Sequence, residues 1–303
     1  MSFAKVYSAQ TTLLKAKIID VEVDISNGLN AFSLVGLADR AVDESKDRVG
    51  AAIKNAGFKS PKSLNQKTVV ALAPADLKKE GPIFDLAIAL AYLLASGDIV
   101  FDATKKLFLG ELSLDGNLRP IIGILPLVQE AKVKGFTEIF LPKENAEEAA
   151  LIDDINIYGA KSLEEVINHL RKQNKNVDDV DEDPTFKITL QPKTEIKPEE
   201  TFFEIDMADV LGQETAKRGL EIAAAGGHNM VMYGPPGTGK TMLAKAFSHL
   251  LPNLSFEEIL ETTSIHSIAG ALRNQTFITR PPFRSPHHTS SHVSLVGGGV
   301  FPK

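Results

Sequence analysis

Eight consecutive residues have the types and spacing of a phosphate-binding loop. A triphosphate needs several inward-pointing backbone N–H donors, and glycine lets the chain curl closely enough to present them. The segment GPPGTGKT matches the pattern G-x-x-x-x-G-K-[S/T] at each fixed position. The lysine would place its charge on the β and γ phosphates, and the final hydroxyl would bind Mg²⁺. We therefore predict an ATP and Mg²⁺ site formed by Gly234, Pro235, Pro236, Gly237, Thr238, Gly239, Lys240 and Thr241.

The segments on both sides of this loop have the patterns that a P-loop requires. Residues 230–233 form a short apolar run, which is typical of a parallel strand buried on both faces. After the loop, apolar residues from Met242 to Leu250 share one helical face, and Pro252 ends the helix. The order of strand, glycine loop and helix predicts a nucleotide site whose phosphates lie at a helix N-terminus.

The acids that hydrolysis requires are not found after the loop. A Walker B carboxylate and a water-orienting acid normally end a later apolar strand. The last aspartate is Asp209, and the only acids after Thr241 are Glu257, Glu258 and Glu261 in an amphipathic helical pattern. We therefore expect the catalytic acids to lie beyond Lys303 in a longer product.

The first 170 residues alternate between strand and helix patterns, which predicts an α/β domain. Gly57 is a typical residue after a helix end, Ser162 and Glu165 form a capping-box pattern, and Asp115-Gly116 suits a type I′ hairpin turn. The expected strands are residues 19–25, 68–73, 107–114, 118–122, 138–141 and 155–158, and the expected helices are residues 39–56, 84–95, 125–134 and 162–172.

Composition divides the chain into two folded parts and a linker. Periodicity fades after residue 172 into an acidic, proline-containing stretch that cannot bury its own backbone. We expect an N-terminal domain at 1–172, a linker at 173–205 and the first part of an ATPase domain at 206–303. The absence of cysteine excludes disulfides and thiolate metal sites, and no apolar run approaches the roughly 20 residues of a membrane span. A cytoplasmic protein without membrane contact is expected.

Net charge is unevenly distributed along the chain. The whole sequence carries −6, but residues 263–303 contain four basic residues and no acid, so this stretch is +4 and the remainder is −10. A basic, acid-free stretch suits contact with phosphates. It also suits a loop that merely lacks carboxylates, and charge alone does not decide between these interpretations.

Three segments together resemble one known family. They are VLGQETAKRGLEIAAAGGHNMVMYGPPGTGKTMLAKAF from residue 210, SIHSIAG from residue 264 and RPPFRSPHHTSSHVSLVGGG from residue 280. These segments resemble the YifB/ComM family of magnesium-chelatase-like AAA+ ATPases, and EGPIFDLAIAL and GELSLDGNLRPIIGILPLVQEA resemble its first domain. The resemblance covers nearly the whole chain.

The first domain resembles the Lon protease catalytic domain, which has the ribosomal S5 domain 2-like fold. That domain would use a serine nucleophile and a lysine base. Alignment of the matching segments puts Ile83 at the nucleophile position and Pro126 at the base position. Neither side chain can do this chemistry, so we expect a non-catalytic domain.

The resemblance also implies partners and further site residues. It implies a hexameric ring that acts on branched or single-stranded DNA, with Gly212 and Gln213 near the adenine. The segment from residue 280 would contact DNA, through Arg280, Arg284, His287 and His288. An alternative is a metal site made of His287, His288 and His292. Two other function classes are a magnesium chelatase ATPase subunit and a nucleotide-sensing binding protein without hydrolysis.

Overall fold

The computed structural model describes residues 3–173, 188–196, 205–272 and 275–297. The chain divides into two compact units, of which the first contains Met1–Glu195 and Ser264–Ala271 and the second contains Ile196–Thr263 and Leu272–Lys303. We describe each unit by itself. The expected α/β fold class is confirmed by the sheet of the first unit.

A seven-stranded mixed sheet forms the centre of the first unit. Its strand order is β3-β4-β2-β1-β5-β8-β9. The β1–β2 and β2–β4 pairs are antiparallel, and the other pairs are parallel. A separate ribbon pairs β6 with β7. The strands are β1 (Phe3–Thr12), β2 (Lys15–Asn27), β3 (Ala31–Val35), β4 (Gln66–Ala73), β5 (Lys106–Phe108), β6 (Glu111–Leu112), β7 (Leu118–Arg119), β8 (Glu138–Pro142) and β9 (Asn156–Ala160).

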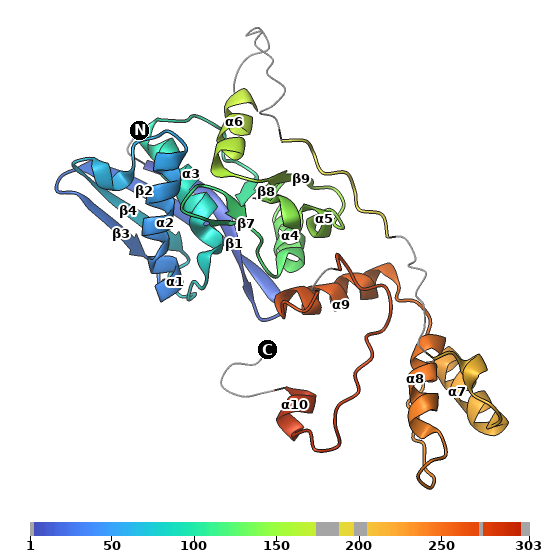
Figure 1. Cartoon of the computed structure of the whole chain (residues 1–303). Coiled ribbons are helices and arrows are strands. Elements are labelled where there is room, and N and C mark those ends of the chain that lie inside the picture. The colour runs from blue at the N-terminus through green and yellow to red at the C-terminus, as the bar shows by residue number, and fades with distance from the viewer. Residues whose placement is uncertain (1–2, 174–187, 197–204, 273–274, 298–303) are drawn as a thin grey trace. The chain divides into compact units, whose positions relative to one another are not determined.

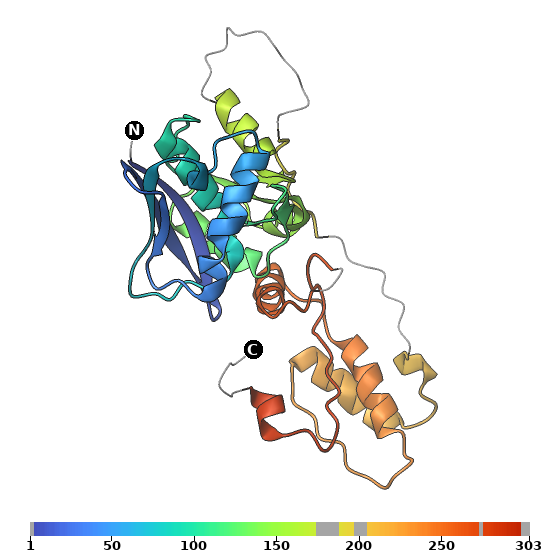
Figure 2. The ribbon, with the colours of Figure 1, turned by 60° about the vertical axis from the view of Figure 1, so that its left-hand side comes forward.

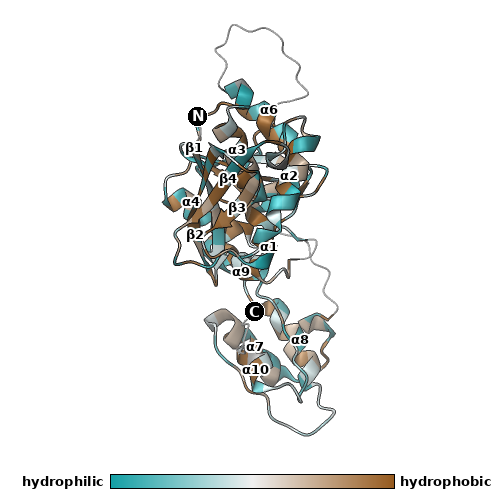
Figure 3. Cartoon of the chain, turned by 90° about the vertical axis from the view of Figure 1, so that its left-hand side faces the viewer, coloured by the Kyte–Doolittle hydropathy of each residue, from teal (hydrophilic) through white to brown (hydrophobic). Residues whose placement is uncertain are grey.

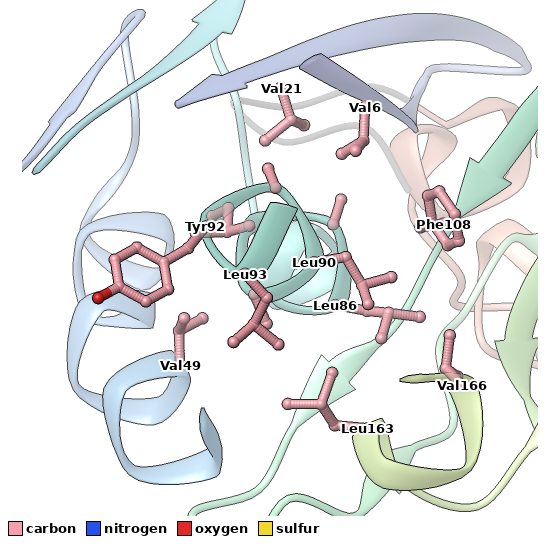
Figure 4. Close-up of a cluster of buried hydrophobic side chains, with 14 of the residues drawn as sticks. Val6, Val21, Val49, Leu86, Leu90, Tyr92, Leu93, Phe108, Leu163 and Val166 are labelled. Atoms are coloured by element: carbon pink, nitrogen blue, oxygen red, sulfur yellow. The ribbon is translucent and has the colours of Figure 1, made fainter. Parts of the chain in front are cut away.

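One face of the sheet packs against helix α3 (Asp85–Ser96), which is apolar nearly all round and almost completely buried. Figure 4 shows Val6 and Val21 pointing at α3 from the sheet, and Leu163 and Val166 approaching it from α6 (Leu163–Gln173). Helix α2 (Ser45–Asn55) lies beside α3 and follows the short α1 (Arg40–Asp43), as Figures 1 and 2 show. This side contains the main core of the unit.

The other face of the sheet packs against α4 (Ile124–Val133) and α5 (Ala146–Ala149). Phe108 and Phe140 belong to the α3 core, whereas their strand neighbours Leu107 and Ile139 are buried outside it. Because successive strand residues point to opposite faces, two helical layers enclose the sheet. Figure 3 shows the strands as mainly hydrophobic and much of α2 as hydrophilic. Short 3-10 helices at Pro61–Ser63, Pro82–Phe84 and Lys143–Asn145 complete the unit.

Most expected elements are present, with two corrections. The expected helix at 39–56 is divided at Glu44 into α1 and α2, and Asp39 caps α1 by accepting from the Val42 N–H. The expected hairpin around Asp115-Gly116 is present but shorter than expected, because only β6 pairs with β7 in antiparallel register, whereas β5 joins the large sheet. Its turn is not type I′, since Gly116 has a φ of 88° but Asp115 does not have a positive φ.

Part of the expected linker packs against the first unit. Ile188 is buried in the α3 core, the Gln191 N–H donates to the Ile157 carbonyl, and the Thr194 N–H donates to the Ala150 carbonyl. This packing contradicts the expectation of an unstructured stretch from 173 to 205, because isolated apolar residues such as Ile188 reach a core that the local composition does not reveal. The acidic residues 178–183 lie outside the described residues.

The end of helix α9 (Phe256–Ile268) also belongs to the first unit. Ser267 donates a 2.5 Å hydrogen bond to Glu148 of α5, and both side chains are buried. Burial raises the pKa of Glu148 from 4.5 to about 7, while bonds from Ser267 and the Leu125 N–H oppose the rise. The carboxyl group is therefore held in an environment that favours its protonated form.

The second unit is mainly helical in its described residues. A 3-10 turn at Met207–Asp209 is followed by α7 (Glu214–Gly226), α8 (Lys240–Leu250), the first part of α9 and α10 (His292–Val296). Its core consists of Val210, Leu220, Leu243 and Ala246, with partly buried neighbours that include Met232 and Phe247. This small core packs α8 against α7 and positions the P-loop.

Candidate nucleotide-binding site

The predicted P-loop forms an open glycine turn that leads directly into α8. Gly237 and Gly239 both have a φ of 81°, a backbone conformation that favours glycine. Gly239 is the N-cap of α8, and Lys240 is its first residue. The free N–H groups of the first turn of a helix form a natural anion site. The sequence therefore places a positive φ where the chain turns toward the helix N-terminus.

The ammonium group of Lys240 lies within the loop. Its Nζ donates to the carbonyl oxygens of Gly234 at 2.9 Å and Pro235 at 2.6 Å, and lies 3.4 Å from Thr238 Oγ1. Thr238 in turn donates to the Pro235 carbonyl at 3.0 Å. These partners are neutral oxygens of the loop itself. A phosphate would offer the same ammonium a charge-assisted partner, which is the stronger interaction.

Thr241 follows in the first turn of α8, and its side chain is exposed. Pro235, Pro236, Gly237 and Gly239 are also exposed, so solvent reaches most of the loop. The Thr241 hydroxyl is therefore accessible to a metal ion carried by a nucleotide.

A cavity of about 390 Å³ lies beside the loop and brings α7 residues together with it. Such a volume is within the range of small-ligand sites. Gln213, the N-cap of α7, lines this cavity with a φ of 57°. Gly212 has a φ of 69° and is exposed, but it is not among the lining residues. The remaining lining residues are Thr215, Ala216, Gly219, Leu220, Met230, Val231, Met232, Tyr233, Gly234, Pro235, Thr238, Lys240 and Leu243.

The expected buried strand at 230–233 is wrong for this structure. Val231 and Tyr233 are 92% and 102% exposed, and the segment is irregular. A parallel strand buried on both faces needs neighbouring strands for its backbone groups. The described residues of the second unit contain no strand. Met232 still packs into the small core.

The basic segment from residue 280 is a mostly exposed, irregular stretch in its described part. Arg284, His287 and His288 are exposed, and Arg280 is half-buried. The two imidazole rings lie 4.1 Å apart between centroids, and His287 Nδ1 lies 2.7 Å from Thr289 Oγ1. His292 is the first residue of α10. Arg273 and Lys303 lie outside the described residues.

A metal site at His287, His288 and His292 receives no support from the structure. Within the described ranges, no group of three His, Cys, Asp or Glu side chains is arranged to hold a metal ion. The same ranges contain no helix with the length and apolarity needed to span a bilayer.

The positions aligned with the Lon protease catalytic pair contain no reactive group. Ile83 lies in a 3-10 turn and packs against the α3 core, and Pro126 is buried in α4. A buried ion pair that the sequence patterns did not predict lies near Ile83 in the chain. Asp85 is completely buried and accepts two hydrogen bonds from Arg48, at 2.7 and 3.1 Å. An aspartate at the start of an otherwise apolar helix was the available signal.

Comparison with known proteins assigns the family. The model for subunit ChlI of Mg-chelatase matches residues 21–145, and the model for magnesium chelatase, subunit ChlI, matches residues 206–303. Competence protein ComM of Haemophilus influenzae is 41% identical over 309 residues, covering 100% of this chain and 57% of that protein. Uncharacterized protein YifB of Escherichia coli is 40% identical over 303 residues, covering 100% and 56%. The chain belongs to the Mg-chelatase ChlI-like family of AAA+ ATPase-like proteins, with ComM and YifB.

Two shorter matches each cover about a third of the chain. Lon protease 2 of Bacillus subtilis is 33% identical over 99 residues, covering 32% of this chain and 18% of the protease. DNA repair protein RadA of Listeria monocytogenes is 33% identical over 95 residues, covering 31% and 21%. The chain spans little more than half the length of its full-length matches. These matches therefore do not by themselves establish the activity of a whole protein of this family.

Proposed function

We propose that this chain is the ATP-binding part of an AAA+ motor that remodels DNA. The observation that carries the nucleotide part is the placement of Lys240, Thr238 and Gln213 around one cavity at the N-terminus of α8. The family is AAA+ ATPase-like, which implies use of a nucleotide and magnesium in general.

The residues of the loop fit a nucleoside triphosphate with its magnesium ion. Gly237 and Gly239 supply the left-handed turns, and Lys240 has only neutral loop oxygens to exchange for phosphate. Thr241 would hold the metal, which supplies charge neutralisation between the β and γ phosphates when bound. Gln213 and the apolar wall at Leu220 and Leu243 would contact the base or ribose, with Gly212 at the edge.

The DNA part of the proposal depends on the basic segment and on a relative. Arg284, His287 and His288 are exposed in a region that contains no acid from residue 263 onward, and Arg280 adjoins them. A segment that carries only positive charge suits contact with a phosphate backbone. RadA is named as a DNA repair protein. We propose branched or single-stranded DNA as the substrate, a hexameric ring as the assembly and the cytoplasm as the setting, where ATP and DNA occur together.

A second candidate function is that of a magnesium chelatase ATPase subunit. Both matching family models describe subunit ChlI, which is the observation that favours it. The two functions share the nucleotide site and differ in what the motor acts on.

ATP turnover by the full-length gene product, measured with and without branched DNA, tests the proposal, with this 303-residue chain as the comparison. Turnover that DNA stimulates supports the DNA motor. Turnover indifferent to DNA supports the chelatase-like function. ATP binding without turnover in either form would refute the motor and leave a nucleotide sensor.

A further inference from the structure

Strand β2 extends beyond one of its two neighbours and leaves a free edge. It pairs with β1 along Lys15 to Asp24, but its pairing with β4 begins only at Asp20. Residues 15–19 therefore have a strand on one side alone. Among the described residues, none forms a further backbone hydrogen bond with this segment. An exposed strand edge is a template for pairing with another chain.

A groove of about 760 Å³ lies beside this free edge, between the start of β2 and helix α4. The α4 wall consists of residues at helical spacing i, i+3, i+4, i+7 and i+8, which form one stripe. The opposite stripe of α4 is buried against the sheet. The groove is therefore formed by rigid elements of one unit, and its lining is Thr12, Leu14, Lys15, Ala16, Lys17, Ile18, Pro126, Gln129, Glu130, Val133 and Lys134.

The lining combines positive charge with exposed apolar side chains. Lys15 and Lys17 are exposed, and no described carboxylate forms an ion pair with either of them. Lys134 lies 3.7 Å from Glu130, the single acid of the lining. Leu14 and Val133 are 61% and 78% exposed. The strand wall therefore carries uncompensated positive charge beside apolar surface.

We propose that the free edge of β2 and the outer stripe of α4 form a docking groove for an extended acidic peptide segment of a partner protein. Strand addition supplies main-chain hydrogen bonds to residues 15–19, and the groove supplies side-chain selectivity. Carboxylates of the peptide pair with Lys15 and Lys17. Its apolar side chains lie on Leu14 and Val133.

The composition of the groove favours a peptide over a nucleic acid strand. Single-stranded nucleic acids bind through stacking on aromatic side chains or arginine together with a basic path. The lining contains neither aromatic residues nor arginine. Lysines along an edge strand also disfavour pairing with strands that offer no negative charge to compensate them. The same residues that protect this edge from non-specific pairing thus select an acidic partner.

Fluorescence anisotropy on the 303-residue chain tests the groove. The probe is a labelled short peptide of alternating Asp and Leu, with an Asn-for-Asp peptide and a labelled oligo-dT as comparisons. The test variant is Lys15→Glu/Lys17→Glu. The matched control is Lys54→Glu/Lys59→Glu, which has the same net charge and changes exposed lysines that do not line the groove. Val133→Asp, in the α4 wall, is a second variant, and circular dichroism verifies folding of each.

We expect the Asp-Leu peptide to bind about tenfold or more weakly to Lys15→Glu/Lys17→Glu and to Val133→Asp, with the control unchanged. The Asn peptide should bind weakly to all four proteins. Equal binding of the Asp-Leu peptide to the test and control variants would overturn the proposal. Binding of oligo-dT that is lost in Lys15→Glu/Lys17→Glu, without binding of the acidic peptide, would overturn it in favour of nucleic acid.

Discussion

Replacing Arg48 with methionine should leave the buried carboxylate of Asp85 without its counter-ion. Asp85 is completely buried, and its oxygens accept Arg48 Nε at 2.7 Å, Arg48 Nη2 at 3.1 Å and the Leu112 N–H at 3.2 Å. Burial raises the pKa of Asp85 from 3.8 to about 6, and the bond and charge of Arg48 oppose that rise. In Arg48→Met this opposition is lost, so the pKa of Asp85 rises further.

The sign of the pH dependence follows from the direction of this shift. When folding raises the pKa of a carboxyl group, the free energy of unfolding of the protein falls as the pH rises from the unfolded-state pKa to the folded-state pKa. In the wild type this loss extends from about pH 4 to about pH 6. In Arg48→Met it continues above pH 6, at about 1.4 kcal/mol per pH unit. We therefore expect the cost of the substitution to increase with pH and to reach about 3–5 kcal/mol, the usual cost of breaking a buried ion pair.

Urea unfolding at several pH values between 5 and 8 measures this effect. Tyrosine fluorescence suits the measurement, because the chain has no tryptophan and three of its four tyrosines, Tyr7, Tyr92 and Tyr158, lie in the first unit. Arg40→Met is the matched control, since Arg40 is 94% exposed and pairs with Glu44 on the surface. Its cost should remain below about 1 kcal/mol. A cost of Arg48→Met that does not change between pH 5 and pH 8 would refute the reasoning.

Three further substitutions test the two units separately. Lys240→Ala should weaken ATP binding by roughly a hundredfold or more in calorimetry while the melting temperature without nucleotide stays unchanged, because the ammonium contacts only loop oxygens. A large loss of melting temperature would contradict this role. Thr241→Ala should reduce the dependence of ATP affinity on Mg²⁺, and an unchanged Mg²⁺ titration would count against it. Glu148→Gln should reduce the stability loss between pH 4.5 and 7 by about 3 kcal/mol relative to the wild type, measured by urea unfolding; a loss as large as in the wild type would assign it to another group.

Elements defined by local patterns could be predicted from the sequence. The apolar run at residues 84–95 becomes α3, and Gly57 follows α2 with a φ of 84°. Ser162 and Glu165 cap α6, where the Glu165 N–H donates to Ser162 Oγ at 3.3 Å and Glu165 Oε2 accepts from the Lys161 N–H. Each feature depends on residues within about one helical turn of one another, so spacing alone reveals it.

Pairings between distant segments could not be predicted in the same way. Arg48 and Asp85 are 37 residues apart, and neither has a local pattern that names its partner. The hairpin was predicted too long, because β5 pairs with β1 and β8 in the large sheet, which the turn at Gly116 does not reveal. The packing of the whole sheet determines which strands pair, because the β-propensity of a segment does not specify which strand lies beside it.

The candidate nucleotide site contains one feature that local residues encode and one that depends on distant residues. The loop could be predicted because its glycines, Lys240 and the start of α8 are contiguous, and the positive φ of Gly237 and Gly239 agrees with that prediction. The strand before it could not form from its own residues, because Val231 and Tyr233 need neighbouring strands to be buried. The backbone geometry of a contiguous segment can therefore be predicted from this chain, whereas the burial of the segment before it depends on neighbouring strands.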